Sequence, residues 1–344
     1  MGTTIYDIAR KAGVSSAAVS MALNKKKGVS EKTRARIMDI AEELNYKPNY
    51  SALSLSTKKS HNVVLFISAV NFQFFDSSFY FSILSAISQS ISNDFFLITR
   101  ISTIDKEAED IAQIADSEKP LAFVFIGTRL SIDFVRRLIG NTPAIFFNKP
   151  NLTGRNVYSV SFDNREAMEM ITGHMLNLGH RKIAYAGYLP GVITAEKRLE
   201  GFHAALSRYG MDKSDGTLIK CEYLPIFGYE AVKRLITEDE ELPSAFVCGN
   251  DLIAVGIMQA LREYGFKVPE DISIAGIDNL LLSDSLWVPL TTVDVKCQEI
   301  GARIAGLIRK IDQGCTENDN IIISVSLVKR ESTGRFNSEG KRKR

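Results

Sequence analysis

Cysteine, histidine and tryptophan are scarce in this chain, whose 344 residues include four, four and one of them. The cysteines lie far apart without a C-x-x-C pair, and the histidines are scattered. We therefore expect free thiols in a reducing compartment, and neither a disulfide framework nor a metal site. No run of about 18 apolar residues occurs, and the start has no apolar export segment, which predicts a protein that is neither exported nor membrane-spanning.

Motifs of the common enzyme classes are missing too. The chain has no phosphate-binding glycine loop, no G-x-S-x-G and no cluster of His and Cys ligands. These absences disfavour an enzyme and predict no bound cofactor and no metal. An enzyme remains the rival class, and turnover of a bound sugar would support it.

Charge is unevenly distributed along the chain. Residues 1–60 contain 11 Lys/Arg against 5 Asp/Glu, a net charge of +6, whereas the other residues contain 31 against 35, a net charge of −4. A basic first segment on a mildly acidic body suggests a polyanionic partner for the first segment alone, although a solvated basic surface would give the same numbers. The length predicts two or three domains.

Three short helices are expected in residues 1–46. Apolar residues at helical spacing predict the first helix, and Gly13 ends it, where the chain needs a positive φ. Ser15 can cap the second helix, and the third starts at Ser30. A helix pair broken by glycine matches a helix-turn-helix, whose second helix lies in the DNA major groove, but a plain αα-hairpin has the same pattern.

From about His61, strand-like runs alternate with helical stretches. Strands that are apolar on both faces predict parallel sheets covered by helices on both sides. The number of runs fits two doubly wound lobes better than one sheet, with a ligand between the lobes, beyond the carboxyl ends of the strands. The runs are VVLFI, FFLIT, LAFVFIG, AIFFN, YSVSF, KIAYAG, AFVCGN, ISIAGID and IIISVSLV.

Several motifs, in their order and spacing, resemble a known family. TTIYDIARKAGVSSAAVSMALN and VSEKTRARIMDIAEELNYKPNYSALSLS resemble the DNA-binding head and hinge of the lactose-repressor/galactose-repressor (LacI/GalR) family. The likeness extends over residues 3–333 through SFDNREAM, HMLNLGHRKIAYAG, RLEGFHAAL, AFVCGNDLIAVGIMQAL, VPEDISIAGIDN and PLTTVDV. Members of that family are dimeric bacterial transcription regulators.

The resemblance implies a fold and a division of the chain. We expect a three-helix helix-turn-helix head with a hinge helix, followed by an α/β two-lobed core like that of periplasmic binding proteins, with two doubly wound parallel sheets. The expected parts are a DNA-binding domain at 1–46, a hinge helix or linker at 47–60, an effector-binding and dimerisation core at 61–333, and a basic, disordered tail at 334–344. Within the core, lobe 1 takes about 61–162 and 294–323, and lobe 2 takes about 163–293 and 324–333.

The resemblance also implies DNA contacts. Ser16, Ala17 and Met21 occupy base-reading positions. The usual Thr-Val-Ser-Arg of the family is replaced here by Ala-Val-Ser-Met at 18–21, so the bidentate partner of guanine is lost and we expect an A·T-leaning outer half-site. The positions that grip phosphates in relatives are occupied by Thr4, Tyr6, Ser15, Ser20, Asn24, Ser30 and Thr33. Ser15 and Ser30 suit helix capping as well.

Asn49, Ala52 and Leu55 match the hinge helix of the family, which enters the minor groove beside its twofold mate. A leucine there partly unstacks the central base step and bends the duplex. Packing of Leu55 on the head is the alternative. Such a helix would form only when DNA and dimer hold it, so it is the expected switch.

Candidate ligand-binding residues follow from the same resemblance. Asp163, Arg198, Asn250 and Asp278 stand at or near strand ends and helix starts, and their carboxylates, amide and guanidinium suit a polyhydroxylated ligand. The matching aromatic positions are Phe79, Tyr80 and Tyr223, with core packing as the alternative for the first two. Cys297 replaces a residue that is often larger in relatives, which leaves that wall of the pocket undefined.

The implied partners are a double-stranded DNA operator, a second copy of the chain and a sugar-like effector. We expect a cytoplasmic protein that is associated with the nucleoid when it binds DNA. No leucine-heptad segment follows residue 333, so a dimer is expected instead of a tetramer. The effector could induce or corepress. The alternative is control by a protein partner such as a phosphocarrier protein.

Overall fold

The computed structural model of the chain describes residues 3–23, 28–44, 46, 60–69, 78–91 and 95–337. It contains two compact units, Met1–His61 and Asn62–Arg344. Most of the predicted basic tail lies outside the described residues. The same is true of four predicted DNA contacts, Asn24, Asn49, Ala52 and Leu55.

The first unit is built from the three predicted helices, α1 (Ile5–Ala12), α2 (Ser16–Leu23) and α3 (Glu31–Glu43). The backbone N–H and the hydroxyl of Thr4 both donate to the Asp7 carboxylate, which fixes the start of α1. Gly13 ends α1 at φ +66, a conformation that glycine adopts without steric cost. The three helices enclose a small apolar core that includes Ile8, Ala12, Val19, Ala22 and Ile37.

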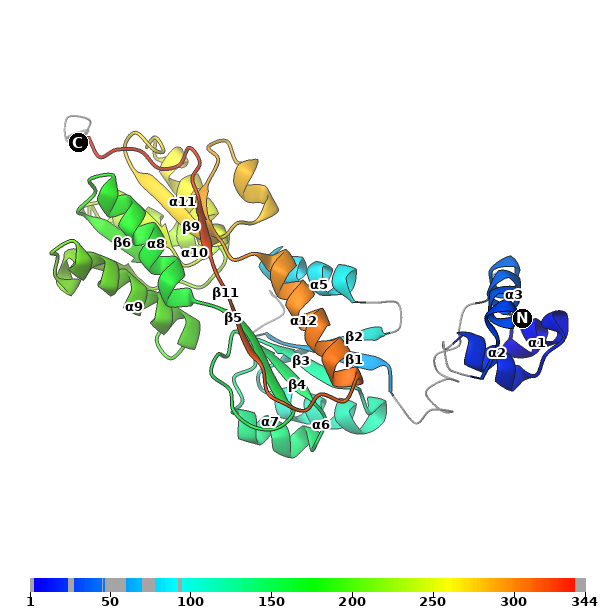
Figure 1. Cartoon of the computed structure of the whole chain (residues 1–344). Coiled ribbons are helices and arrows are strands. Elements are labelled where there is room, and N and C mark those ends of the chain that lie inside the picture. The colour runs from blue at the N-terminus through cyan, green and yellow to red at the C-terminus, as the bar shows by residue number, and fades with distance from the viewer. Residues whose placement is uncertain are drawn as a thin grey trace. The chain divides into compact units, whose positions relative to one another are not determined.

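The second unit contains two six-stranded sheets, each forming one lobe (Figure 1). Sheet A has the order β11-β5-β4-β3-β1-β2, and every neighbouring pair is parallel. Its strands are β1 (Asn62–Ala69), β2 (Phe96–Thr103), β3 (Ala122–Ile126), β4 (Ala144–Phe147), β5 (Val157–Phe162) and β11 (Asn320–Ile323). Its helices are α5 (Ser78–Ser90), α6 (Glu107–Glu118), α7 (Ile132–Ile139) and α12 (Cys297–Asp312).

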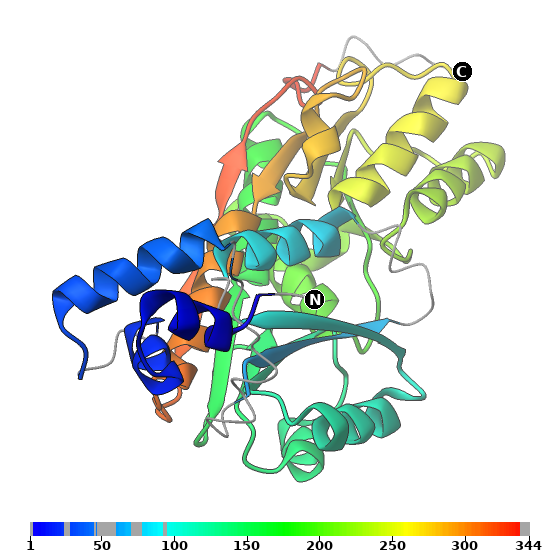
Figure 2. The same cartoon turned by 90° about the vertical axis from the view of Figure 1, so that its right-hand side faces the viewer.

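Sheet B has the order β12-β10-β9-β8-β6-β7. Its strands are β6 (Ile183–Ala186), β7 (Gly216–Ile219), β8 (Ala245–Cys248), β9 (Ser273–Asp278), β10 (Thr291–Asp294) and β12 (Ser326–Val328). Its helices are α8 (Asn164–Asn177), α9 (Ile193–Arg208), α10 (Pro225–Thr237) and α11 (Asp251–Glu263), with the short 3-10 helices η2 (Lys213–Asp215) and η3 (Leu281–Asp284). Figure 2 shows the two lobes one above the other.

Helices cover both faces of each sheet, as the doubly apolar strands predict. In lobe 1, α5 and α12 pack on one face and α6 and α7 on the other. In lobe 2, α8 and α9 cover one face and α10 and α11 the other. The predicted two-lobed, doubly wound architecture is confirmed.

Two details differ from the prediction. The run IIISVSLV was expected as one strand, but it is divided into β11 and β12 because the chain crosses there from sheet A to sheet B. β12 pairs antiparallel with β10, so sheet B is parallel except at this edge. β7 was not among the predicted runs, because it begins with glycine and leaves only its last residue buried.

Candidate functional site

The outer surface of α2 is the candidate base-reading surface. Val19 and Ala22 are buried, whereas Ala17 is exposed and Ser16 and Met21 are half-buried. Arg34, on α3, donates through Nη1 to the carbonyls of Met21 at 3.3 Å and Ala22 at 2.8 Å. A cation at the C-terminal end of a helix satisfies carbonyls that have no helical partner. Arg34 therefore holds the recognition helix in place, a role that the sequence analysis missed.

The predicted phosphate contacts have structural roles in the head. Ser15 Oγ accepts from the N–H of Ala18 at 3.1 Å, and Ser30 Oγ accepts from the N–H of Thr33 at 3.2 Å, so both serines cap helices. Tyr6 leaves 67% of its surface exposed, so its side chain is accessible to a partner. A hydroxyl that caps a helix can still donate its own proton, so contact of these residues with phosphate stays a prediction.

The second candidate site lies in the core and is centred on Arg198, which is 6% exposed on α9. Its Nε donates to Oδ1 of Asn164 at 3.0 Å, and its Nη1 donates to the carbonyl of Gly249 at 2.5 Å. The guanidinium also lies over the ring of Tyr223, 5.5 Å from the ring centre. Arg198 is thus fixed on three sides at the carboxyl ends of the lobe 2 strands.

Tyr223, Asp278 and Tyr80 surround this guanidinium. Asp278 ends β9, and burial together with the charge of Asp251 raises its pKa well above the usual range, against the opposing effect of Arg198. Burial raises the pKa of Tyr80, on α5 of lobe 1, and the charge of Asp278 raises it further. Burial raises the pKa of the Tyr223 hydroxyl, while the neighbouring Arg198 and Tyr185 lower it. Groups from both lobes therefore meet at one polar centre.

Asp251 fixes the backbone next to this centre through hydrogen bonds. It is fully buried and accepts from the Leu280 N–H at 3.0 Å, the Ser283 hydroxyl at 2.6 Å and the Thr292 hydroxyl at 2.5 Å. These bonds fix the segment that follows Asp278 and the neighbouring strand β10. Asp278 itself has a φ of +123, which is rare for a residue with a side chain. Burial outweighs the three donors and raises the pKa of Asp251 to about 6. The sequence analysis missed Asp251, although it directly follows Asn250.

Three of the predicted ligand residues cap helices or pack against other side chains. Asn250 caps α11, accepting from the Ile253 N–H at 2.9 Å while its amide donates to the Tyr223 carbonyl at 3.2 Å. Asp163 is exposed and caps α8. The ring of Phe79 packs against Phe147 and Tyr80, with ring centres 6.1 and 5.5 Å apart. Ligand contact by these three residues stays a prediction.

Cys297 stands beside the polar centre at the start of α12. Burial raises the pKa of its thiol to about 12, and the negative charges of Asp278 and Asp294 contribute to the same increase. All four cysteines are free thiols, as expected. At neutral pH the Cys297 thiol is therefore uncharged, and it is a small side chain at this side of the polar centre.

Comparison with known proteins identifies the family. Residues 4–49 match the model of bacterial regulatory proteins of the lacI family, and residues 172–333 match that of the periplasmic binding protein-like domain. The probable HTH-type transcriptional repressor ExuR of Bacillus subtilis (strain 168) is 29% identical over 97% of this chain and 99% of its own length. Catabolite control protein A of Priestia megaterium is 27% identical over 94% of this chain and 96% of its own. The chain belongs to the lacI family.

Solved structures agree with this assignment. The crystal structure of the lac repressor dimer bound to operator and the anti-inducer ONPF covers 97% of this lacI-family chain and 100% of its own, with a TM-score of 0.75 at 25% identity. The complex of the transcriptional regulator CelR with cellobiose has the same fold, with a TM-score of 0.70 at 23% identity, over 96% and 99% of the two chains. The predicted helix-turn-helix head and binding-protein-like core are confirmed.

The lacI-family chain is a DNA-binding transcriptional regulator and not an enzyme, because the relatives that match it over nearly its whole length are transcriptional regulators. In the described part of the chain, no helix is long and apolar enough to cross a membrane. No group of three or more His, Cys, Asp or Glu within the described ranges could hold a metal ion.

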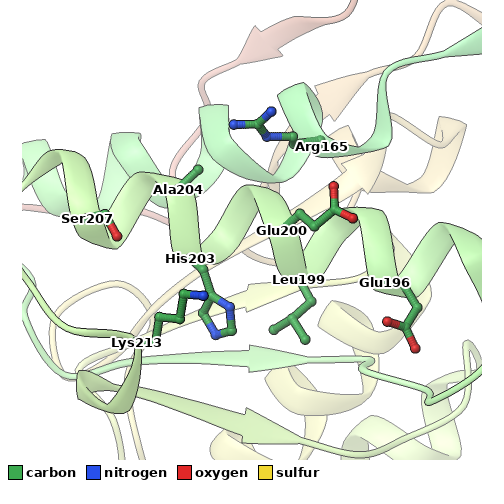
Figure 3. Close-up of a pocket in the computed structure, with 8 residues that line it drawn as sticks. All are labelled: Arg165, Glu196, Leu199, Glu200, His203, Ala204, Ser207 and Lys213. Atoms are coloured by element: carbon green, nitrogen blue, oxygen red, sulfur yellow. The ribbon is translucent and has the colours of Figure 1, made fainter.

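A hollow of about 360 Å³ lies elsewhere on this lacI-family core (Figure 3). It is lined by Arg165, Glu196, Leu199, Glu200, His203, Ala204, Ser207 and Lys213. The lining comes from the outer surfaces of α8, α9 and η2, and Glu200 is already paired with Lys197 at 2.8 Å. The hollow is wide open to solvent and mixes both signs of charge, so the buried centre at Arg198 is the better candidate for a ligand.

Proposed function

We propose that this protein is a homodimeric transcriptional repressor whose affinity for a palindromic operator is controlled by a small polyhydroxylated effector bound between the two lobes. The observation that carries the proposal is the polar centre formed by Arg198, Tyr223 and Asp278 of lobe 2 and Tyr80 of lobe 1. The guanidinium, the two phenols and the carboxyl that meet here can exchange hydrogen bonds with neighbouring hydroxyl groups of a sugar.

We assign DNA binding to residues 1–46 and the hinge at 47–60, and effector binding and dimerisation to 61–333. In this proposal Ser16, Ala17 and Met21 face the bases, and Leu55 enters the minor groove from the hinge. Ala17 and Met21 offer apolar contact to thymine methyl groups, which supports an A·T-leaning half-site. The regulator acts in the bacterial cytoplasm, where it meets its operator.

Control by the effector follows from a difference in affinity. A ligand shifts the equilibrium between two lobe arrangements only by the ratio of its affinities for them. Because the coupling is reciprocal, an effector that lowers operator affinity is itself bound more weakly by the operator complex. Induction and corepression therefore differ only in which arrangement the effector prefers.

Thermal unfolding against a panel of small molecules tests the effector. The panel contains sugars, sugar phosphates, polyols and nucleosides, including cellobiose and ribose, which two proteins of this fold bind. A ligand at a hundred times its dissociation constant should stabilise the protein by about 2.7 kcal/mol. Arg198→Ala should abolish the shift relative to its own midpoint, whereas Arg165→Ala, an exposed arginine at the start of α8, should keep it. A silent panel with intact DNA binding would exclude these ligands as effectors and point to a protein partner or a ligand class outside the panel.

Selection of operators from random duplexes tests the reading helix. Wild-type protein should select palindromic sites with A·T pairs at the outer half-site positions. Met21→Arg restores the usual family residue and should add a preference for guanine there, because arginine binds guanine through two hydrogen bonds. Selection of guanine at that position by both wild type and Met21→Ala would contradict the assignment of Met21.

A further inference from the structure

A continuous row of hydrogen bonds joins the two lobes beside Arg198. Asn148, which directly follows β4 in lobe 1, accepts through Oδ1 from Nδ2 of Asn164 at 3.2 Å. Asn164, the first residue of α8, accepts in turn through its own Oδ1 from Arg198 Nε at 3.0 Å. Arg198 Nη1 then donates to the carbonyl of Gly249, which follows β8 in lobe 2, at 2.5 Å. The Asn164 amide therefore donates one bond to lobe 1 and accepts one from Arg198 of lobe 2.

The direction of every bond in this row is determined by chemistry. A guanidinium can only donate, so the oxygen of the Asn164 amide must face Arg198. Its NH2 group must then face Asn148, whose acceptor oxygen turns toward it. Asn164 is 7% exposed and Arg198 6%, so neither can exchange these partners for bulk water. An unpaired buried donor or acceptor costs about 1–3 kcal/mol, which keeps the row intact.

The two ends of the row belong to different lobes of the core. Asn148 is held in sheet A, because its N–H donates to the Val160 carbonyl at 3.0 Å. Asn164 begins α8, which packs against β8, β9 and β10 of sheet B. A rotation of the lobes must therefore change the separation of the Asn148 and Asn164 side chains. Arg198 is hydrogen-bonded to the same Asn164 amide, so its orientation depends on that change.

We propose that Asn164 is the positioning residue that couples Arg198 to lobe 1, so that a ligand held by Arg198 responds to the arrangement of the lobes. This rests on the proposed effector site, and the hydrogen bonds that carry it join Asn148, Asn164, Arg198 and Gly249. If Asn164 couples Arg198 to lobe 1, loss of the Asn148–Asn164 hydrogen bond alone should change the arrangement of the lobes. Loss of the Arg198 side chain, which bonds to Asn164 from lobe 2, should change it as well.

Two substitutions at Asn148 form a matched pair. Asn148→Gly removes the acceptor, and glycine tolerates the φ of +59 at this position. Asn148→Asp keeps an oxygen toward the Asn164 NH2 group. Asn148 does not belong to the polar centre, and the unfolding midpoints of the two variants would show that the fold is retained.

Double electron–electron resonance on the full-length protein without added ligand measures the distance between two spin labels, one on each lobe. Spin labels on keto amino acids at exposed Asp133 in lobe 1 and Glu240 in lobe 2 avoid the native thiols. Asn148→Gly, Asn164→Ala and Arg198→Ala should each shift or broaden the wild-type distance distribution, while Asn148→Asp should leave it unchanged. Asn148→Gly combined with Asn164→Ala should do no more than Asn164→Ala alone.

A distribution in Asn148→Gly identical to that of the wild type would overturn the proposal, as would an additive effect in the double variant. Because this measurement uses no effector, its failure is separate from a silent ligand panel. If the panel finds a sugar, the same ligand should narrow the wild-type distribution and change that of Asn148→Gly less. An equal change in both would also contradict the coupling.

Discussion

At the scale of single residues, buried acids shape the candidate effector site. Asp278 holds φ +123 at the end of β9, and the strain of such a conformation persists only where neighbouring groups fix it. Asp251 supplies that restraint through its bonds to Leu280, Ser283 and Thr292. Gly276 leaves the necessary space, since a Cβ there would lie 2.2 Å from Asp251 Oδ1. Asp251 and Asp278 therefore act as one unit.

Asp251→Asn should change how stability depends on pH. The pKa of Asp251 is about 6 in the folded protein, above its usual value of 3.8, so its protonated form favours folding. That contribution is fully present below about pH 4 and lost as pH rises through 6. The unfolding free energy of wild type minus that of Asp251→Asn should therefore fall by about 2–3 kcal/mol between pH 4 and 7. Urea unfolding across this range measures it, with exposed Asp133→Asn giving a flat difference.

A wild-type advantage over Asp251→Asn that stays constant or grows with pH would show that the three donors, and not burial, dominate at this carboxyl. The variant should be less stable at every pH, because an amide cannot accept from three donors with its single oxygen.

The residues of the polar centre differ in how far the sequence could predict them. Arg198 and Asp278 stand in motifs that the family resemblance aligns, so the sequence was sufficient to place them near the strand ends of the core, while their contact with a ligand stays a prediction. Asn164 and Asp251 each directly follow a predicted residue, Asp163 and Asn250, yet their roles depend on partners that the fold brings from elsewhere in the chain. No local pattern carries that information, because Asn164 pairs across the lobes and Asp251 pairs with residues 29 to 41 positions further along lobe 2.

At the scale of elements, apolar periodicity was sufficient for most helices and strands. It failed where a strand is short and open to solvent, as in β7, and where one apolar run serves two sheets, as in β11 and β12. A run of apolar residues shows that a strand is buried, but it does not show which sheet buries it. Here the chain passes from sheet A to sheet B between β11 and β12, so each half of the run is buried by a different sheet.

Two glycine-to-alanine substitutions should have opposite effects on the core. Gly140 ends α7 at φ +62 and ψ −127, whereas Gly173 lies inside α8 with helical geometry, and an added Cβ would meet no atom within 4 Å at either. Gly140→Ala should therefore lose about 1–3 kcal/mol to backbone strain alone. Gly173→Ala should gain about 0.5–1 kcal/mol from helix propensity. Denaturant unfolding of both variants, which share the same chemical change, isolates the backbone term; equal signs would contradict it.

At the scale of the whole molecule, the two units differ in size and charge. The first unit has a core of a few side chains from three short helices and carries the excess of basic residues, whereas the second contains two sheets with helices on both faces. A small core buries too little surface to be strongly stable alone. The arrangement suits the proposed regulator, in which the larger unit receives the signal and the smaller one binds DNA.

Calorimetry of the full-length protein should resolve this division as two transitions. The head should unfold first with a small enthalpy and the core later with a large one, because unfolding enthalpy scales with the number of residues. A ligand stabilises only the part to which it binds, so a sugar found by the panel should raise the second midpoint and leave the first in place. A selected operator duplex should raise the first. A sugar that raised both midpoints equally without DNA would show that head and core unfold together, and coupling would then be a property of the free protein instead of the DNA-bound dimer.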